Sequence, residues 1–294
     1  MLRMKSLKLS ILVSILLVQF SFSQEIEETE QSNIQTYTPS KLLEKGKWDI
    51  KWFNNLYTQT KEDRNGETFE VPRSTFFTTS VEVFTGASNN KKFNVGFIAE
   101  YRYNTFEFQD QPLISPINTE DKSRTGLSHI APSVKIAPFI SLPRFSIQSS
   151  FFIPVFDKES DENGFLAQKS FIWQNRFFYD YTFPGNKFQL FSEFGTRLFL
   201  GNKDEGFANN SIELAPGVFL SYFPTSKFTV LGFIQHAQLV DLGNEFEQNY
   251  SALGAGSKYQ LTKTLNVEVL YSKFVRGSDS GLGQSFNLGL RAIF

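Results

Sequence analysis

From about residue 47 to the last residue, apolar and polar positions alternate along most of the chain. In FIWQNRFFYDYTF, residues 171–183, one face carries Phe171, Trp173, Phe177, Tyr179, Tyr181 and Phe183. The segments KFNVGFIAEYRYN, LNVEVLYS and the terminal FNLGLRAIF repeat this pattern. A period of two with one apolar face indicates a β-strand that lies between two different environments. The pattern therefore predicts an all-β protein.

Twelve segments carry the alternation. They lie near 47–60, 74–86, 92–108, 127–139, 145–157, 170–183, 188–201, 211–224, 228–242, 249–262, 265–276 and 283–294. The last of them ends on the aromatic residue Phe294. An open strand edge is not tolerated in lipid, so we expect this segment to pair with the strand at 47–60.

The connections between these segments alternate in length. The short ones are 88–91, 141–144, 184–187, 224–227 and 262–264, and the long ones are 61–73, 109–126, 158–169, 202–210, 243–248 and 277–282. An even number of antiparallel strands, with tight turns on one side and long loops on the other, is typical of a transmembrane antiparallel up-and-down β-barrel. A water-soluble two-sheet sandwich also alternates, but its strands are usually shorter, and aromatic residues near strand ends favour a membrane interface.

The N-terminus differs from the rest of the chain. Residues 1–23 begin with Arg3, Lys5 and Lys8 and continue into a mainly apolar segment that is too short to span a membrane as a helix. Ser21 and Ser23 precede a plausible cleavage site, which is the pattern of a secretory signal peptide. We expect residues 1–23 to be this signal peptide, 24–46 a polar periplasmic lead and 47–294 the barrel, located in the bacterial outer membrane with both ends in the periplasm.

Composition supports this interpretation and excludes several alternatives. The chain has 34 phenylalanines, and aromatic residues make up 16% of it. Without the three basic residues of the signal peptide, 26 of the 29 basic residues remain against 30 acidic ones, which excludes a nucleic-acid-binding protein. The absence of cysteine excludes disulfides, thiolate metal sites and a cysteine nucleophile.

The polar face of the strands predicts what lines the lumen. The candidate residues, for a solute path or an ion-pair network, are Glu82, Glu100, Arg102, His129, Lys135, Arg176, Asp180, Glu193, Arg197, Glu213, Lys258, Glu268 and Arg291, with Asp49 and Lys51 on the first strand. Acids and bases balance, which indicates cross-strand ion pairs such as Glu100 with Arg102 and Arg176 with Asp180. Opposed acidic and basic walls along a channel are the alternative. The same face carries Phe84, Phe191, Phe199 and Phe219, so we expect a narrow lumen.

Catalytic and metal sites find little support in the sequence. His129 follows Ser128, but neighbouring strand residues point to opposite faces, and His236 has no serine two positions away. The loop 158–169 carries acidic residues spaced like part of a calcium loop, but Ser170 stands where the bidentate glutamate is needed. We expect no enzymatic activity, no metal and no cofactor.

Several stretches resemble known membrane proteins. The terminal LGLRAIF, together with the signal and the alternating strands, is similar to Gram-negative outer-membrane β-barrel proteins across the mature chain. TGLSHIAPSVKIAPF, FFIPVF and LAPGVFLSYFPTSKFTVLGF resemble outer-membrane transporters named after a phenol-degradation (MetA-type) pathway. The resemblance implies that Phe294 is an assembly signal read by the barrel-assembly machinery. It also implies outer-membrane lipid and lipopolysaccharide as partners, while an envelope protein partner stays open.

These observations predict a narrow passive channel for small solutes. The alternative is a non-conducting barrel, either a structural or accessory subunit of an envelope complex or a protein that presents its loops for binding.

Overall fold

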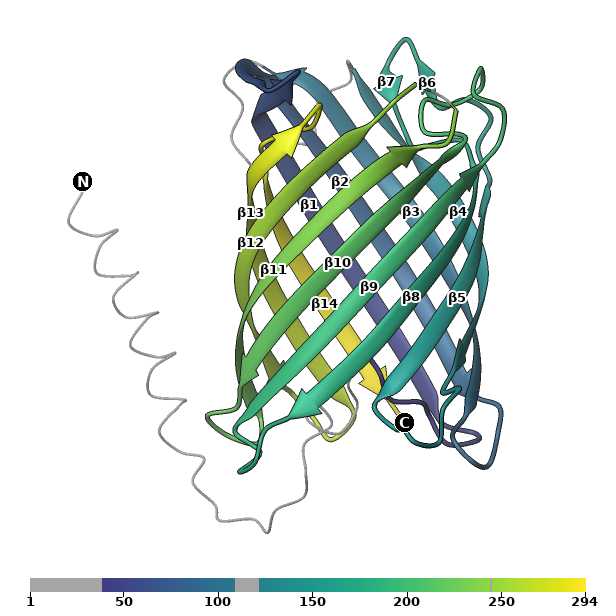
Figure 1. The fold of residues 1–294 in the computed structure, drawn as a ribbon, viewed down its shortest axis with the longest axis vertical. Helices are drawn as coiled ribbons and strands as arrows, with labels where there is room; N and C mark the ends of the chain where they lie inside the picture. The colour runs from purple at the N-terminus through teal and green to yellow at the C-terminus, as the bar shows by residue number, and fades with distance from the viewer. Residues whose placement is uncertain (1–38, 109–121, 244) are drawn as a thin grey trace, which may run out of the picture. The chain divides into compact units, whose positions relative to one another are not determined.

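Twelve antiparallel strands close into one barrel in the computed structural model, which describes residues 39–108, 122–243 and 245–294 (Figure 1). The barrel strands are β1 (Trp48–Arg64), β2 (Glu67–Gly86), β3 (Phe93–Phe108), β4 (Ser123–Ile136), β5 (Phe145–Pro154), β8 (Phe171–Thr182), β9 (Phe188–Leu200), β10 (Ser211–Tyr222), β11 (Phe228–Asp241), β12 (Gln248–Gln260), β13 (Leu265–Ser278) and β14 (Gln284–Ile293). A separate hairpin is formed by β6 (Ser160–Asp161) and β7 (Gly164–Phe165). The predicted signal peptide and most of the predicted lead lie outside the described residues.

The predicted fold is confirmed: every barrel strand overlaps one of the twelve alternating segments. Within the described ranges, no helix has the length and apolar character needed to cross a membrane.

The barrel closes where the first and last strands meet, as the terminal pattern predicted. β1 pairs with β14 from Asp49 opposite Ile293 to Thr58 opposite Gln284. Beyond the last ladder pair, the Trp48 amide donates to the Phe294 carbonyl at 2.7 Å, and the Phe294 amide donates back at 3.0 Å. This pairing removes the open edge, whose unsatisfied backbone groups would be costly in lipid.

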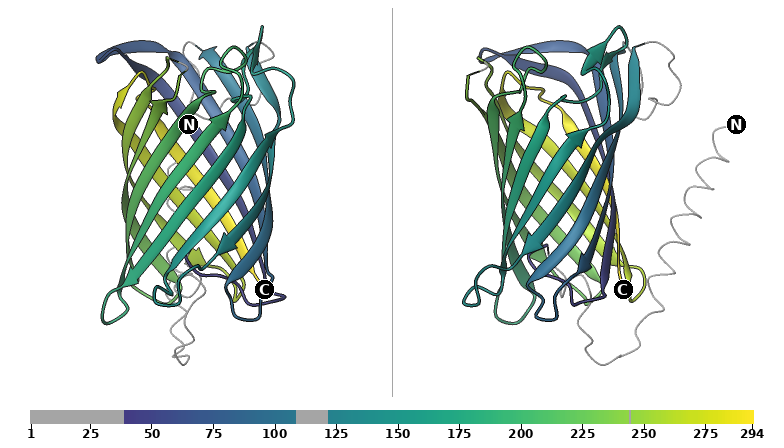
Figure 2. Two further views of the ribbon diagram at one scale, coloured as in Figure 1. Left: turned by 45° about the vertical axis from the view of Figure 1, so that its right-hand side comes forward. Right: turned by 90° about the vertical axis from the view of Figure 1, so that its right-hand side faces the viewer.

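The two ends of the barrel differ. The five predicted short connections, the start of β1 and the end of β14 lie at one end, which we call the turn end. The β6–β7 hairpin, the longer loops and the β1–β2 turn lie at the other, the loop end (Figures 1 and 2).

One predicted loop is wrong. Residues 61–73 were expected as a long loop, but they belong mostly to β1 and β2, which are joined by Asn65 and Gly66. Both turn residues have positive φ, 54° and 84°, as a two-residue hairpin turn of the favoured type requires. The hairpin extends across the loop end (Figure 2) and pairs there with the β13–β14 loop, where the Asp63 amide donates to the Ser280 carbonyl at 2.8 Å.

Side chains alternate between the outer wall and the lumen. Outward-facing aromatic side chains are well exposed, as for Trp173 at 49%. The indole Nε1 of Trp173 donates to Ser149 at 3.0 Å, and that of Trp52 donates to Thr79 at 2.8 Å. Each indole N–H is therefore satisfied on an otherwise apolar face, as a lipid-facing wall requires.

Candidate solute path through the barrel lumen

The lumen holds two cavities, one above the other along the barrel. The loop-end cavity has a volume of about 600 Å³, and the turn-end cavity has a volume of about 250 Å³. Four lining residues are common to both: Phe53, Glu193, Phe219 and Leu270. The two cavities therefore adjoin at a level that these four side chains define.

Aromatic and amide side chains dominate the loop-end cavity. The aromatic lining residues are Phe53, Tyr57, Phe76, Phe219, Phe233, Tyr250 and Phe274, and the amides are Asn55, Gln59, Gln235, Gln248 and Asn287. The Phe274 ring centre lies 4.8 Å from that of Tyr57 and 4.6 Å from that of Tyr250. Glu193 is the one carboxylate among the described residues that line this cavity. The loop-end cavity therefore suits a flat or apolar group with few charges.

A row of phenylalanines runs across four neighbouring strands on the lumen side. Ring centres are 5.9 Å apart between Phe178 and Phe191, 5.5 Å between Phe191 and Phe219, and 5.2 Å between Phe219 and Phe233. Phe178 and Phe191 line the turn-end cavity, Phe233 lines the loop-end cavity, and Phe219 lines both. This phenylalanine wall is a continuous apolar surface that connects the two cavities.

Charged side chains encircle the turn-end cavity. Its basic lining residues are Lys41, Lys51, Lys135, Arg176, Lys258 and Arg291, and its acidic ones are Asp49, Glu82, Glu193 and Glu268. Three ion pairs lie among them: Arg176 with Glu193 at 2.7 Å, Lys258 with Glu268 at 2.5 Å, and Arg291 with Asp49 at 2.6 Å. The ring therefore has two more bases than acids, whereas the lumen set predicted from the sequence was balanced.

The structure places most of the predicted lumen residues in two groups. Nine of them line the turn-end cavity: Asp49, Lys51, Glu82, Lys135, Arg176, Glu193, Lys258, Glu268 and Arg291. Nearer the loop end, Arg102 pairs with Glu100 at 3.5 Å and Arg197 with Glu213 at 3.6 Å. These four residues line neither of the two cavities. Whether either group acts on a solute stays a prediction.

One predicted pair has a different partner. Arg176 was expected to pair with Asp180, but its guanidinium donates to Glu193 on β9, at 2.7 Å from Nε and 3.3 Å from Nη2. Residues four apart on one strand are separated by roughly 13 Å, whereas β8 and β9 lie side by side. Asp180 instead accepts a hydrogen bond from Gln189 at 3.5 Å.

The two histidines have separate environments. His129 is buried, with Phe152 and Phe156 packed edge-on against its ring and Glu100 at 3.9 Å from Nδ1. His236 lies 2.9 Å from the Ser251 hydroxyl, a contact between β11 and β12. Inspection of one strand at a time could not find it, because the two residues are neighbours only through sheet pairing.

A segment before β1 packs into the turn end of the barrel. Residues 39–47, here called the strap, bury Leu42 and Leu43, and Leu43 is only 2% exposed. The Gly46 amide donates to the Gly86 carbonyl at 3.2 Å, and the Gly86 amide donates to the Lys47 carbonyl at 3.1 Å.

The strap also reaches the lumen. The buried ammonium of Lys135 donates to the backbone carbonyls of Pro39 and Lys41, and both strap residues line the turn-end cavity. The predicted polar lead did not anticipate this apolar contact, whose sequence signal is the Leu42–Leu43 pair.

The chain matches a known family over most of its length. The family model described as "Putative MetA-pathway of phenol degradation" matches residues 68–292. The chain belongs to this family. The match begins inside β2 and ends in β14, so it includes the phenylalanine wall and most of the charged ring but neither β1 nor the strap.

Solved structures show that this MetA-pathway family member has an outer-membrane-type fold. An outer-membrane channel from Pseudomonas putida F1 matches with a TM-score of 0.68 and 9% identity, over 92% of this chain and 100% of that one. The β-domain of the Bordetella autotransporter BrkA matches with a TM-score of 0.54 and 12% identity, over 83% of this chain and 98% of that one. A search of curated proteins found no match.

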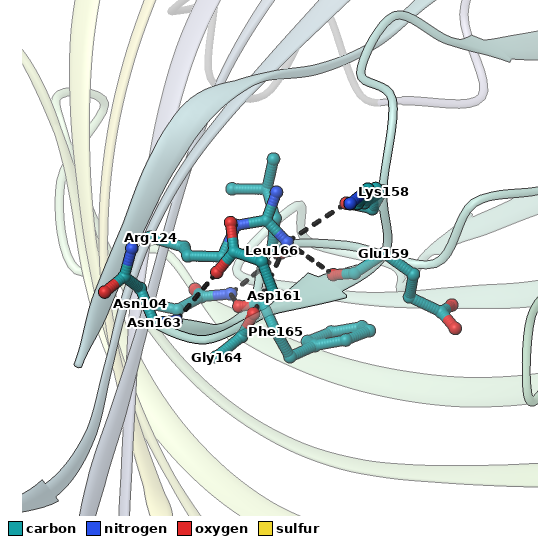
Figure 3. Close-up of polar contacts among 9 residues, drawn as sticks. All are labelled: Asn104, Arg124, Lys158, Glu159, Asp161, Asn163, Gly164, Phe165 and Leu166. Carbon is teal, nitrogen blue, oxygen red and sulfur yellow. Dashed lines mark hydrogen bonds and ion pairs between the residues drawn. The ribbon is translucent and has the colours of Figure 1, made fainter.

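At the loop end, this family member fixes its β6–β7 hairpin by Arg124 of β4 and Asn104 of β3 (Figure 3). Asn104 Nδ2 donates to the carbonyls of Phe165 at 3.0 Å and Leu166 at 2.8 Å. Arg124 Nη1 donates to the carbonyls of Lys158 and Glu159 at 3.0 Å and of Gly164 at 3.3 Å. Its Nε lies 3.1 Å from the Asp161 carboxylate. The hairpin is therefore anchored to the barrel wall through both backbone and side-chain contacts.

Two acidic residues at this hairpin, Asp161 and Glu159, are held by the protein itself. Asp161 accepts a hydrogen bond from the Asn163 amide at 2.8 Å, besides its ion pair with Arg124. Glu159 accepts from the Lys169 amide at 3.2 Å, and burial raises the pKa of its carboxyl. These contacts account for the acidic spacing that echoed a calcium loop, and the part of the chain that the structure describes holds no cluster of three metal-ligating side chains.

Proposed function

We propose that the protein is a passive outer-membrane channel for small solutes that carry a flat or apolar group. Residues 1–23 direct its export, and the turn end faces the periplasm. The observation that carries this proposal is the phenylalanine wall, because it continues from the loop-end cavity into the turn-end cavity. A solute can keep one apolar face against this wall as it moves along the barrel.

The other lumen groups complement the wall. The amides that line the loop-end cavity offer exchangeable hydrogen bonds to a solute that has lost part of its hydration shell. Many weak, similar sites favour passage over tight binding, because conduction requires both entry and release. Ion pairs such as Arg176 with Glu193 hold charged side chains against the barrel strands around the turn-end cavity.

A second candidate function is a non-conducting barrel, and the strap favours it. With Leu43 buried and Lys135 bound to strap carbonyls, the strap occupies part of the turn end. A strap that stays in place would give a structural barrel that presents its loops, not a channel.

Planar-bilayer conductance separates the two candidates. The mature protein and a variant lacking residues 24–43 should be compared in the same lipid. A channel predicts single-channel steps for at least the shortened variant, and larger steps when Phe219→Ala widens the level shared by the two cavities. Val218→Ala, on the outward face of the same strand, is the matched control and should leave the steps unchanged. No conductance from either length of chain would contradict the channel and support the structural barrel.

A further inference from the structure

Lys51 is a cation of the turn-end cavity without an ion-pair partner. No carboxylate of the described residues lies within 4 Å of its ammonium, whereas Lys258 and Arg291 each have one at 2.5–2.6 Å. Its Nζ lies 4.8 Å from the ring centre of Phe53, which lines both cavities. Its charge therefore faces the lumen beside an aromatic surface.

The strands that flank Lys51 give it no ion pair within 4 Å among the described residues. In the sheet register Lys51 stands opposite Arg291 on β14 and opposite Glu82 on β2. Arg291 is already bound to Asp49 through two hydrogen bonds, and Glu82 forms no ion pair within 4 Å in the described ranges. Like charges directly opposite each other on a sheet destabilise it. A bound anion would relieve this arrangement.

The lining of the turn-end cavity as a whole also has an excess of positive charge. Its lining has six basic and four acidic residues, and three of the acids are already paired with Arg176, Lys258 and Arg291. In a low-dielectric lumen a net positive charge concentrates anions.

The phenylalanine wall lies beside two other cations of the cavity. The Phe178 ring has the Lys135 ammonium at 5.2 Å and the Arg176 guanidinium at 4.9 Å from its centre, and it begins the phenylalanine wall. A carboxylate and a flat apolar group would therefore each find a matching surface within one cavity of about 250 Å³.

We propose that the turn-end cavity binds small aromatic carboxylates, with Lys51 as the cation that receives the carboxylate and the phenylalanine wall as the surface that receives the ring. This site deepens the proposed function by naming its solute class. Binding at the site can be measured without conduction, so the two proposals can fail separately.

Calorimetric titration of the detergent-solubilised mature protein with benzoate tests the site, with benzamide as the uncharged probe of nearly the same shape. Benzoate should bind at least about tenfold more tightly than benzamide, because a hydrogen bond to a charged partner contributes that much. Lys51→Met should remove most of this preference. Lys273→Met is the matched control, because this exposed lysine of β13 donates to the Leu282 carbonyl at the loop end, and it should retain the preference.

A second variant is expected to raise the affinity for benzoate. It keeps the proposal testable if Lys51→Met does not fold. Glu82→Gln removes the acid opposite Lys51 and should tighten benzoate binding several-fold. Equal affinities for benzoate and benzamide, or no binding of either, would overturn the proposal, as would an unchanged preference in a folded Lys51→Met protein or no gain in Glu82→Gln. A benzoate preference without bilayer conductance would contradict the channel and support the binding site. Conductance without a benzoate preference would support the channel and contradict the binding site.

Discussion

Arg291 holds Asp49 by two hydrogen bonds across the seam where the last strand meets the first. Nε lies 2.8 Å from Oδ1 and Nη2 lies 2.6 Å from Oδ2. Only 20% and 18% of the two side chains are exposed. The contact is therefore a two-point ion pair, largely shielded from bulk water, at the position that closes the barrel.

Removing one partner of this pair should weaken the barrel. Arg291→Met leaves the Asp49 carboxylate without its donor, and breaking a buried ion pair in this way costs about 3–5 kcal/mol of unfolding free energy. Urea unfolding in lipid vesicles, followed by tryptophan fluorescence, measures the loss. Lys61→Met is the control, because its pair with Glu70 is 3.5 Å long and its side chains are 53% and 85% exposed. The control should change stability by less than about 1 kcal/mol.

A double variant distinguishes loss of the pair from loss of packing. Asp49→Leu combined with Arg291→Met should recover much of the stability, because no uncompensated charge remains. If the double variant is as unstable as Arg291→Met alone, the ion pair is not the cause.

The next prediction concerns the two faces of β8. Trp173 points outward and is 49% exposed, while its neighbour Gln174 lies on the lumen side, opposite Arg197 in the register with β9. Trp173→Asp places a charge on the lipid face and removes an interfacial aromatic, which should cost on the order of 2 kcal/mol. Gln174→Asp places the same charge beside an arginine and should cost much less. Heat-modifiability on gels measures both, and equal melting of the two variants would show that the faces are assigned wrongly.

The faces could be predicted because each strand carries its own local signal. The apolar and polar positions of residues 171–183 repeat at a period of two, so Trp173 and Gln174 fall on opposite walls whatever the neighbouring strands are. Phe191 and Phe219 were placed on the lumen side for the same reason, and both line the turn-end cavity. Even the closure of β1 on β14 followed from the physics of an unpaired edge.

The predictions that were wrong or incomplete concern contacts between distant parts of the chain. A register shift between Gln59 and Lys61 interrupts the alternation, so the pattern predicts a loop where β1 extends toward the Asn65–Gly66 turn, although that dipeptide is a strong hairpin signal. The partner of Arg176 depends on which residue of β9 lies beside it. The burial of Leu43 depends on the turn end of the barrel, which strands distant in the sequence form.

A third prediction tests the strap through a close backbone approach. A Cβ atom added at Gly86 would overlap the carbonyl oxygen of Glu44, which is backbone and cannot rotate away. Gly86→Ala should therefore displace the strap and raise single-channel conductance, while the barrel itself keeps its heat-modifiability.

The control for the strap is a glycine with free space. A Cβ atom at Gly126 on β4 would have the Leu166 side chain as its nearest neighbour, at an ordinary 3.7 Å, so Gly126→Ala should leave conductance unchanged. Glu44→Gln provides a second control, because it removes only the ion pair between the exposed Glu44 and Lys91. If Gly86→Ala behaves like these two variants, the strap does not limit conduction.

The fourth prediction concerns the pH dependence of the β6–β7 hairpin. Burial raises the pKa of Glu159 in the docked hairpin, so the docked form binds a proton more tightly than the free form does. Docking is therefore strongest below the ordinary glutamate pKa of about 4.3 and weakens as the pH rises through the raised value. Because the chain has no cysteine, a spin label at Ser160→Cys reports on the hairpin alone, and its mobility should increase as the pH rises from about 4.3 through the raised pKa of Glu159.

Glu159→Gln keeps the shape of the side chain and removes its titration. In the labelled background it should abolish most of the pH dependence and keep the label immobile at high pH. Glu162→Gln, an exposed neighbour, is the control and should retain the wild-type profile. Arg124→Met should increase the mobility of the label at every pH, because Arg124 bonds the carbonyls of Lys158, Glu159 and Gly164 whether or not Glu159 is ionised. An unchanged pH profile in Glu159→Gln would assign the transition to another group.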